Sequence, residues 1–339
     1  MTMKLGSKKG DEKFNALHEQ LESIADSYVA DPKKIAEYLQ FASRFYLYSP
    51  ANTMLIHRQN PHATFVASFQ AWRSQGHSVR RGETGMKIFV PVNGTFFKDA
   101  SGIVKQLSQA TEEERKLVKE NKLESWQRLL FKIGTVFDIV QTNVPYTEYP
   151  KILTPGVSSY EHATIAERLA IYIQENVCDI KTERTEGATI FGSFTPKDNI
   201  IHISPALEDT ARLSTLAHEL GHAVMHNAQP ELSPVEMEFQ ADAFSIMLHQ
   251  ELGLEVSEDT KGHLAHVFNE MKKEVESEAI KNAPAESDKK NYVLSSQRRA
   301  MISSLKDVHI AYSEHLPSIL KTIKDPSKPK DFERTDQEK

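Results

Sequence analysis

The chain has 339 residues and a formal net charge of −6, with 26% charged and 39% hydrophobic residues. That length suggests about two domains, and the composition is typical of a folded soluble protein and too apolar for a disordered one. No run of about 18 apolar residues is present, so we expect no membrane contact. The first residues lack the apolar core of a secretory leader. Cys178 is the single cysteine, which excludes intramolecular disulfides and Cys-rich metal sites and favours a cytoplasmic protein.

Charge is unevenly distributed along the chain. Residues 1–150 carry 20 Lys and Arg against 16 Asp and Glu, whereas the remainder carries 21 against 31. The excess of basic residues is strongest within 41–105. A basic segment in an acidic protein indicates an anionic partner for that segment. The alternative is a solvated basic face with no partner.

The first half combines helical and extended patterns. The helices that we predict there are 12–29, 32–48, a short third helix ending at His57, 69–74 and 111–128. Strands are predicted at Met86–Val92 and Gly94–Lys98, and Asn93-Gly94 between them is a typical hairpin turn. Another apolar, β-branched strand follows at 131–142.

The second half begins after a Pro-rich stretch and becomes increasingly helical. A helix is predicted at 160–176, a strand hairpin turns around Pro196–Asn199, and everything after Leu207 is helical in pattern, except a loop at 281–291. We therefore predict an α+β protein with a first domain at 12–145, a linker at 146–158, a second domain at 159–324 and a disordered tail at 325–339.

The clearest chemical motif is His218-Glu219-Leu220-Gly221-His222, within the apolar helical window LSTLAHELGHAVMH. Residues i and i+4 share one face of a helix, so the imidazoles of His218 and His222 can reach one zinc ion. Glu219 lies about 100° around the helix. This spacing is typical of metallopeptidases, in which the glutamate is the general base.

A pair of acidic residues follows in the apolar helix VEMEFQADAFSIML. Glu238 and Asp242 are spaced i, i+4, and burying two unpaired carboxylates there would cost several kcal/mol. A catalytic zinc ion takes three protein ligands, so we assign Glu238 as the third ligand and Asp242 as the acceptor for a ligating histidine N–H. The alternative is that this face is merely solvated.

Other candidates near this motif have weaker claims. His226 lies about 12 Å along the helix axis from His218 and is too far to complete the metal site, so we expect it to line the cleft or to hydrogen-bond locally. The strand Asn199–Ser204 is a candidate edge for an extended peptide. Tyr292 is a candidate for stabilising the oxyanion.

Two stretches of this chain resemble known families. TLAHELGHAVMH and EFQADAFSIML, preceded by GSFTPKDNIIHISP, resemble the ImmA/IrrE zinc metallopeptidases over roughly 160–255. The resemblance implies a gluzincin-like, mostly helical domain with a small sheet and one Zn²⁺ held by His218, His222 and Glu238, with Glu219 as catalytic base. Members of that group often cleave regulators such as repressors.

The first half resembles a different family. SPANTMLIHRQNPHATFVASFQAWRSQGHSVRRGETGMKIFVPV, continuing to FKIGTVFDIVQT, is similar to the N-terminal domain of ArdC-type antirestriction proteins and LtrC-like proteins over about 12–145. The resemblance implies binding of single-stranded DNA and a setting on a plasmid or another mobile element. The order of the two domains also matches ArdC, whereas the charged insert near 106–126 is a departure from the pattern.

Basic and aromatic residues alternate in this half, as in proteins that bind single strands through a basic groove and stacking platforms. The DNA-binding residues that we predict are Arg44, Trp72, Arg73, Arg80, Arg81 and Lys87. The function predicted overall is a single-stranded-DNA-binding zinc metallopeptidase with an antirestriction role and an unknown protein or peptide substrate. Two alternatives stay open: a regulatory protease that cleaves a repressor-type protein, and a non-enzymatic DNA-coating protein with structural zinc.

Overall fold

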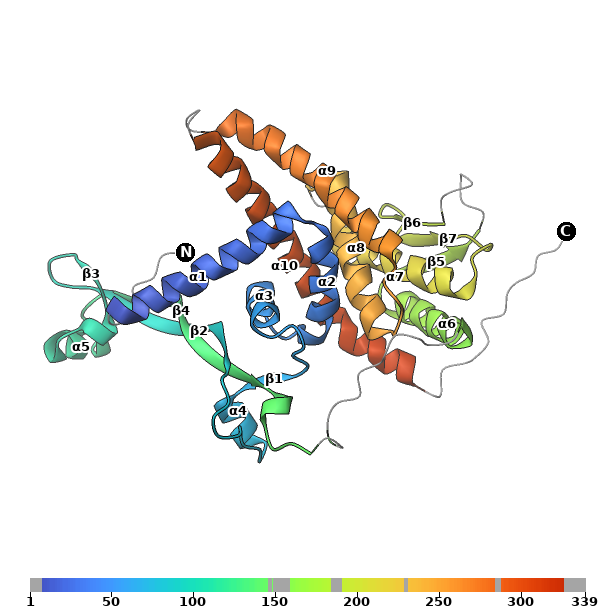
Figure 1. The fold of residues 1–339 in the computed structure, drawn as a ribbon. Coiled ribbons are helices and arrows are strands. Elements are labelled where there is room, and N and C mark those ends of the chain that lie inside the picture. Colours follow the sequence, from blue (N-terminus) through green and yellow to red (C-terminus); the bar gives the residue numbers. More distant parts are fainter. Residues whose placement is uncertain are drawn as a thin grey trace. The chain divides into compact units, whose positions relative to one another are not determined.

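The computed structural model describes residues 8–145, 148, 159–183, 191–228, 231–283 and 288–325 (Figure 1). The chain divides into two compact units, the first formed by Met1–Leu21 and Ala63–Tyr146 and the second by Glu22–His62 and Thr147–Lys339. Apart from Glu148 and Asp325, the predicted linker and tail lie outside the described residues. Both units combine helices with a small sheet, so the predicted α+β class is confirmed.

The first unit is built on a four-stranded antiparallel sheet in the order β1-β4-β2-β3. Its elements are β1 (Val66–Ser68), α4 (Phe69–Ser74), β2 (Met86–Lys98), β3 (Val104–Gln106), η2 (Leu107–Gln109), α5 (Glu112–Lys119), β4 (Ser125–Asp138), η3 (Ile139–Gln141) and the first part of α1 (Lys8–Ala30). The α1 helix packs on the sheet through Phe14, whose ring centroid lies 5.0 Å from that of Phe89. The long β2–β4 ribbon is the main feature of this unit (Figure 1).

The predicted hairpin turn at Asn93-Gly94 is wrong. Both residues lie inside β2, where they pair with Leu129 and Arg128 of β4. Gly94 is required for a close approach rather than for a turn, because a Cβ atom there would lie 2.4 Å from the Leu130 side chain. A glycine in a strand often marks such an approach.

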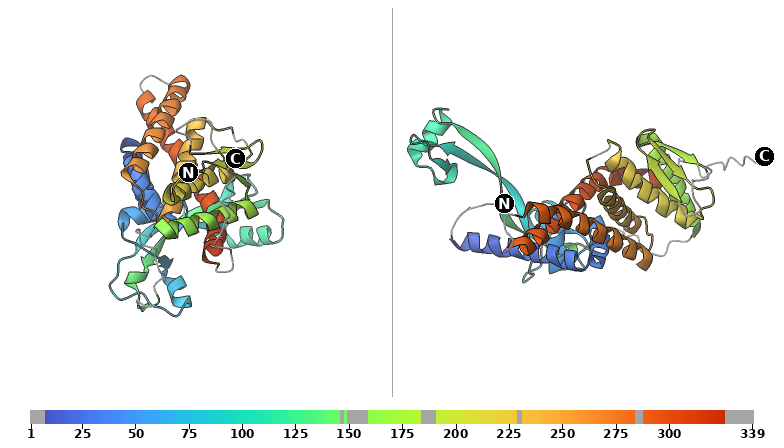
Figure 2. Two further views of the ribbon diagram at one scale, coloured as in Figure 1. Left: turned by 90° about the vertical axis from the view of Figure 1, so that its right-hand side faces the viewer. Right: turned by 90° about the horizontal axis from the view of Figure 1, so that it is seen from above.

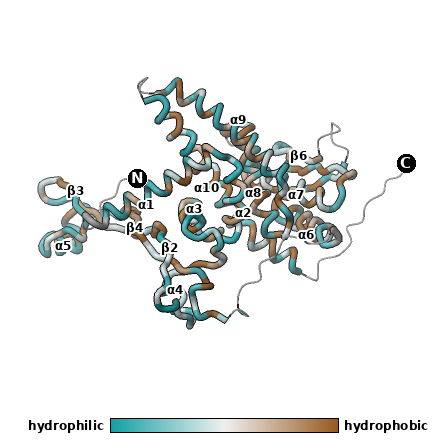
Figure 3. The backbone as a smooth tube through the Cα atoms, viewed as in Figure 1, coloured by the Kyte–Doolittle hydropathy of each residue, from teal (hydrophilic) through white to brown (hydrophobic). Residues whose placement is uncertain are grey.

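The charged run 111–128 is a short helix followed by a strand, whereas we predicted one helix. A capping box between Thr111 and Glu114 starts α5, which ends at Lys119. Asn121 then adopts a left-handed conformation with φ of 55°, which turns the chain so that β4 begins at Ser125. The hydrophilic surface of α5 is evident in Figure 3.

The second unit packs helices around one central helix and adds a three-stranded sheet. Its elements are α2 (Lys33–Ala42), η1 (Ser43–Phe45), α3 (Pro50–Gln59), α6 (Ser159–Asn176), β5 (Asp179–Thr182), β6 (Gly192–Thr195), β7 (Ile200–Ile203), α7 (Asp209–His226), α8 (Pro234–Glu251), α9 (Glu258–Asn282) and α10 (Lys289–Lys324). The sheet order is β5-β7-β6, with β5 parallel and β6 antiparallel to β7. The predicted hairpin around Pro196–Asn199 joins β6 to β7.

The α8 helix is the centre of this unit (Figure 2). Every residue from Phe239 to Gln250 is buried, because α7, α9, α10 and α2 all contact it. A helix that is buried on all sides is apolar all round. Burying the polar side chains of α8 therefore costs free energy unless each has a hydrogen-bond partner.

Residues Glu22–His62 belong to the second unit, although the sequence pattern groups them with the first domain. The α2 helix buries Ile35 and Leu39 and contacts α8 and α9. Next to it, Ser43 Oγ donates a hydrogen bond to Glu251 Oε1 (3.1 Å). None of the described helices combines the length and hydropathy that a bilayer span requires.

Candidate metal centre and nucleic-acid interface

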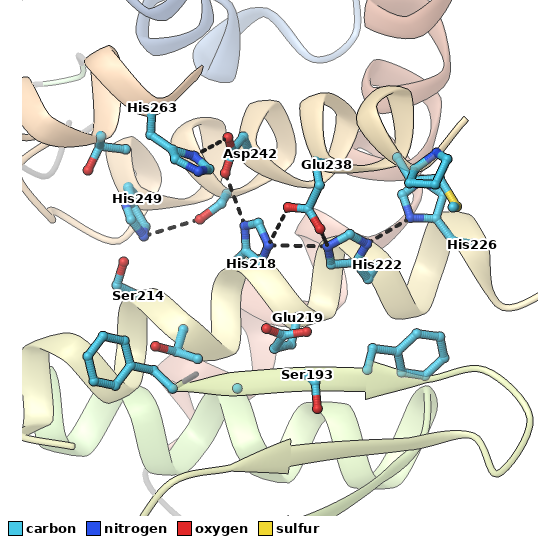
Figure 4. Close-up of a pocket in the computed structure, with 18 of the residues that line it drawn as sticks. Ser193, Ser214, His218, Glu219, His222, His226, Glu238, Asp242, His249 and His263 are labelled. Atoms are coloured by element: carbon cyan, nitrogen blue, oxygen red, sulfur yellow. Dashed lines mark hydrogen bonds and ion pairs between the residues drawn. The ribbon is translucent and has the colours of Figure 1, made fainter. Parts of the chain in front are cut away.

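The close packing of α7 on α8 places the motif residues against the acidic pair. Gly221, inside the motif, lies where a Cβ atom would be 3.1 Å from Ala241 Cα and 3.2 Å from Ala241 O. The absence of a side chain therefore lets the two helix backbones approach. His218 and His222 on α7 consequently face Glu238, one turn before Ala241 on α8 (Figure 4).

Three side chains converge on one point of this interface. His218 Nε2 lies 3.5 Å from Glu238 Oε2, and His222 Nε2 lies 3.4 Å from Glu238 Oε1. The two Nε2 atoms are 3.2 Å apart. One ligand atom from each residue lies within 4.8 Å of the others, so the three could hold one metal ion.

The second acidic residue of α8, Asp242, contacts two histidines. His218 Nδ1 donates to Asp242 Oδ1 (3.2 Å), and His263 Nδ1 from α9 donates to Asp242 Oδ2 (2.8 Å). Asp242 is buried, and although burial raises the pKa of its carboxyl, the bonds to His218 and His263 hold that pKa below its usual value. Asp242 thus lies where we predicted it, beside the Nδ1 atom of His218. No sequence pattern pointed to His263.

Glu219 lies between the two histidines and the small sheet. Figure 4 shows it on the side of α7 that faces β6, where a Cβ atom on Gly192 would come within 3.1 Å of its Oε1. Glu219 is only 6% exposed. Burial raises the pKa of its carboxyl above the ordinary value, against the opposing effect of His218 and His222. The raised pKa makes this carboxyl a better proton acceptor than an exposed glutamate.

These groups line a cavity of about 1020 Å³. One wall is β6 with Phe191 and Pro196, another is α8, and Asp259, Thr260 and His263 of α9 complete it. The strand that borders the cavity is β6, whereas β7 is the middle strand of the sheet. The prediction that Asn199–Ser204 offers a peptide-binding edge is therefore wrong, because β5 and β6 occupy both of its sides.

Two further predicted residues can now be placed. Tyr292 is not among the residues that line the cavity and lies against Arg299, whose guanidinium carbon is 6.0 Å from the ring centroid. Its suggested role in stabilising an oxyanion is wrong for that reason. His226 lines the cavity and is hydrogen-bonded locally, with its Nδ1 3.0 Å from His222 Nδ1.

The chemistry of the donor set fits a divalent metal. Two imidazole nitrogens and a carboxylate oxygen are ligands that Zn²⁺ takes in catalytic sites, where a fourth position stays open. The other ring nitrogen of each histidine already has a partner, Asp242 for His218 and His226 for His222. Such contacts orient the ligating nitrogen. The Glu238 side chain is 47% exposed, so this position is accessible to a substrate.

The predicted DNA-binding residues are placed in different environments. Arg73, Arg81 and Lys87 are exposed residues of the first unit. Arg80 is exposed as well and is held by Glu83, 3.4 Å from its Nε, and by the carbonyl of Val140. Arg44 is half-buried and lies in η1, which belongs to the second unit rather than the first.

Trp72 is a core residue rather than a stacking platform. It is 6% exposed, and its Nε1–H donates to Phe137 O (2.9 Å). A base cannot stack on a ring whose faces are covered. The prediction for Trp72 is therefore corrected by its burial, as is common for tryptophans that find an internal partner.

A basic and aromatic row on β4 was missed by the sequence analysis. Trp126, Arg128 and Lys132 are all exposed, and their even spacing places them on one face of the strand. We call this set the β4 row. It was missed because Trp126 and Arg128 fall in the run that was predicted as a helix. A strand prediction starting at Ser125 would have revealed it.

Comparison with known proteins finds two families along the chain. Residues 11–137 match the family described as the N-terminal domain of the anti-restriction factor ArdC, and residues 166–276 match the Peptidase_M78 family, described as an IrrE N-terminal-like domain. The chain has an ArdC-like two-domain architecture. Both resemblances noted in the sequence are thereby confirmed, over 11–137 in the first half and 166–276 in the second.

Individual relatives of the ArdC-like chain are distant. The uncharacterized protein pXO2-81 of Bacillus anthracis is 30% identical over 277 residues, which cover 74% of this chain and 46% of that protein. The chain thus spans about half the length of this curated relative. The crystal structure of antirestriction protein ArdC from plasmid R388 is similar in its metal-free form (16% identity, TM-score 0.44, 81% of this chain and 85% of that one). Its Mn(II)-bound form gives 15% identity and a TM-score of 0.48, over 90% and 98% of the two chains.

Proposed function

We propose that this chain is a zinc-dependent peptidase, with Zn²⁺ held by His218, His222 and Glu238. The observation that carries the proposal is the convergence of these three ligand atoms beside the buried Glu219 in one cavity. Three protein ligands leave one position for water or substrate, as in catalytic zinc sites. The accessible Glu238 favours this reading over the alternative of a closed, structural zinc site.

Each residue then has a defined task. A bound metal supplies a Lewis acid that polarises the scissile carbonyl. Glu219 removes a proton from the attacking water and returns it to the leaving amine, and its raised pKa suits a group that must hold that proton between the two steps. Asp242 keeps the His218 ring in place.

The edge of β6 supports a peptide as substrate. In the sheet that the described residues form, β6 is an end strand and borders the cavity. An extended chain can add to such an edge through main-chain hydrogen bonds. Ser193 and Phe194 of β6 would thereby run beside the scissile bond, since Gly192 is next to Glu219.

Hydrolysis of an unfolded protein tests the peptidase proposal. Casein is incubated with the zinc-loaded full chain, with Glu219→Gln, and with Glu208→Gln as a control on the same helix. Glu208 is exposed and makes no cap bond, so its variant should keep wild-type activity. We expect Glu219→Gln to bind zinc and to lose cleavage by a factor of about 10² or more. Cleavage that survives in Glu219→Gln would refute its role.

We also propose that the first unit binds single-stranded DNA, because the β4 row places the exposed Trp126 two residues from the exposed Arg128, with Lys132 further along the same strand. Single-strand binders combine a charged track for the phosphates with aromatic rings for the bases. The exposed Arg73, Arg81 and Lys87 add positive charge to the same unit. The ArdC N-terminal family match supports this partner.

Fluorescence anisotropy with labelled single-stranded and duplex oligonucleotides over a salt series tests this second proposal. We expect single strands to bind, with affinity falling as salt rises. The double variant Arg128→Ala/Lys132→Ala should weaken binding and reduce the slope of log affinity against log salt by about two. The double variant Arg80→Ala/Arg81→Ala measures the contribution of two residues predicted from the sequence, for comparison with the β4 row. An absence of binding at low salt would remove the DNA-binding function and leave a protein-docking unit.

We propose an antirestriction role on a mobile element for the whole protein, supported by the ArdC-like architecture. Transfer of an unmodified plasmid into a restricting host, with and without the gene, tests it. Protection that is lost in Glu219→Gln would link it to cleavage. Protection that persists would favour DNA coating, and cleavage of a repressor without any protection would favour a regulatory protease.

A further inference from the structure

A line of three polar side chains, His222, His226 and Gln240, leads from the cavity wall into the α7–α8 interface. His222 Nδ1 lies 3.0 Å from His226 Nδ1, and His226 Nε2 lies 2.9 Å from Gln240 Oε1. His226 is 3% exposed and Gln240 is 1% exposed. The line therefore joins α7 to α8 through the interior, where each hydrogen bond has a definite direction.

The direction of these bonds follows from the last member of the line. The carbonyl oxygen of Gln240 only accepts, so His226 Nε2 must carry a hydrogen. A neutral imidazole has one donor and one acceptor nitrogen, so His226 Nδ1 is the acceptor for His222 Nδ1–H. His222 Nε2 is then the ring nitrogen available to a metal, and it lies 3.4 Å from Glu238 Oε1 and 3.2 Å from His218 Nε2.

The orientation of the Gln240 amide therefore determines, through His226, which ring nitrogen of His222 carries the proton. A reversed amide would donate to His226 Nε2, His226 Nδ1–H would donate to His222, and His222 Nε2 would carry a proton where it should bind a metal. The observed orientation leaves Gln240 Nε2 buried without a partner among the described residues. The Gln240 Nε2 group therefore makes no hydrogen bond to the described residues while Oε1 accepts one from His226.

We propose that Gln240 and His226 are positioning residues that fix His222 in the tautomer whose Nε2 is free to bind the metal. This inference rests on the proposed metal centre. The two ligating histidines are then oriented by different chemistry, because His218 donates to a carboxylate while His222 donates to a neutral relay. The relay orients its ligand without adding a second negative charge beside Glu238.

Nuclear magnetic resonance on the full chain reads the tautomer directly. With ¹⁵N-labelled histidine rings, long-range ¹H–¹⁵N spectra of the metal-free protein distinguish protonated from unprotonated ring nitrogens, and His226→Gln identifies the resonances. We expect His222 to be protonated at Nδ1 and His226 at Nε2. A proton on His226 Nδ1, with none on His222 Nδ1, would overturn the proposal.

Zinc affinity, measured by competition with a chelator, tests the consequence. His226→Phe removes the acceptor and should weaken zinc binding about 10- to 100-fold, the usual effect of losing such a contact. His226→Gln, which keeps a carbonyl acceptor, should restore affinity to within a few-fold of wild type. Gln240→Leu should weaken binding by less than His226→Phe, because His226 could then adopt either tautomer.

Gln297→Leu is the matched control, because Gln297 is a buried glutamine of α10 that bonds to Lys272 O outside the line. It should leave zinc affinity unchanged. Equal affinity in His226→Phe and wild type, or equal weakening in His226→Phe and His226→Gln, would refute the relay. If the wild type itself binds no zinc, the metal centre fails, and the tautomer measurement still decides whether the relay exists.

Discussion

Replacing Gly221 by alanine should weaken zinc binding at the proposed metal centre. The residue carries no ligand atom, yet it lies at a close approach of α7 to α8. An alanine Cβ would lie 3.1 Å and 3.2 Å from backbone atoms of Ala241, and 3.4 Å from Phe244 Cβ. Because backbone cannot rotate out of the way, α8 must move by a few tenths of an ångström.

The size of the effect comes from two opposing contributions. Overpacking of a tight contact costs about 1–3 kcal/mol, whereas alanine in place of glycine stabilises a helix interior by about 1 kcal/mol. We expect Gly221→Ala to lower the free energy of unfolding by up to about 2 kcal/mol. The ligand distances of a well-formed metal site lie within about 0.2 Å of their usual values, so moving Glu238 away from His218 and His222 should weaken zinc binding about tenfold.

Urea unfolding of the metal-free chain and chelator competition measure the two effects separately. Gly262→Ala in α9 is the control, because a Cβ atom there meets no atom within 4 Å. It should stabilise the protein by about 1 kcal/mol and leave zinc affinity unchanged. If Gly221→Ala behaved like Gly262→Ala in both measurements, the helix contact would not set the ligand geometry, and the reasoning would be refuted.

Three other predictions address the two units. His218→Ala should abolish high-affinity zinc binding in the chelator assay, and wild-type affinity would exclude it as a ligand. Burial raises the pKa of Glu219, and the base is active only when deprotonated, so kcat/KM should fall on acidification at a pH above the ordinary value for a glutamate; an acid limb at the ordinary value would contradict this. Trp72→Ala should destabilise the first unit by about 3–5 kcal/mol, whereas Trp126→Ala should leave stability unchanged and cost about 1–3 kcal/mol of single-strand affinity. The opposite pattern in urea titration and anisotropy would reverse our assignment of core and platform.

The grouping of the metal-centre residues was predictable because it depends on local periodicity. His218 and His222 are one helical turn apart, and so are Glu238 and Asp242. Once both segments are helices, the apolar residues around them make burial against each other the natural arrangement. The two family resemblances anticipated the same architecture.

Features that depend on contacts distant in sequence were not predictable in this way. His263 reaches Asp242 from another helix, and β6 borders the cavity because the sheet order places β7 in the middle. Asn93-Gly94 has the composition of a turn, but pairing with β4 overrides that preference. The β4 row was concealed by a charged run whose helix ends early, at Lys119.

The order of segments along the chain has a consequence for folding. The second unit leaves off at His62 and resumes at Thr147, so the segment between them is an insertion that its two parts must span. Within that insertion, Val66 pairs with Asp138. This pairing shortens the effective loop from roughly 80 residues to roughly 12, which lowers the entropy cost of bringing the two parts of the second unit together by about 1.7 kcal/mol at 0.6 kcal/mol per halving. The pairing of β1 with β4 therefore favours folding of the second unit by shortening the loop between its two parts, and weakening this pairing should slow the folding of a unit to which the four-stranded sheet contributes no residue.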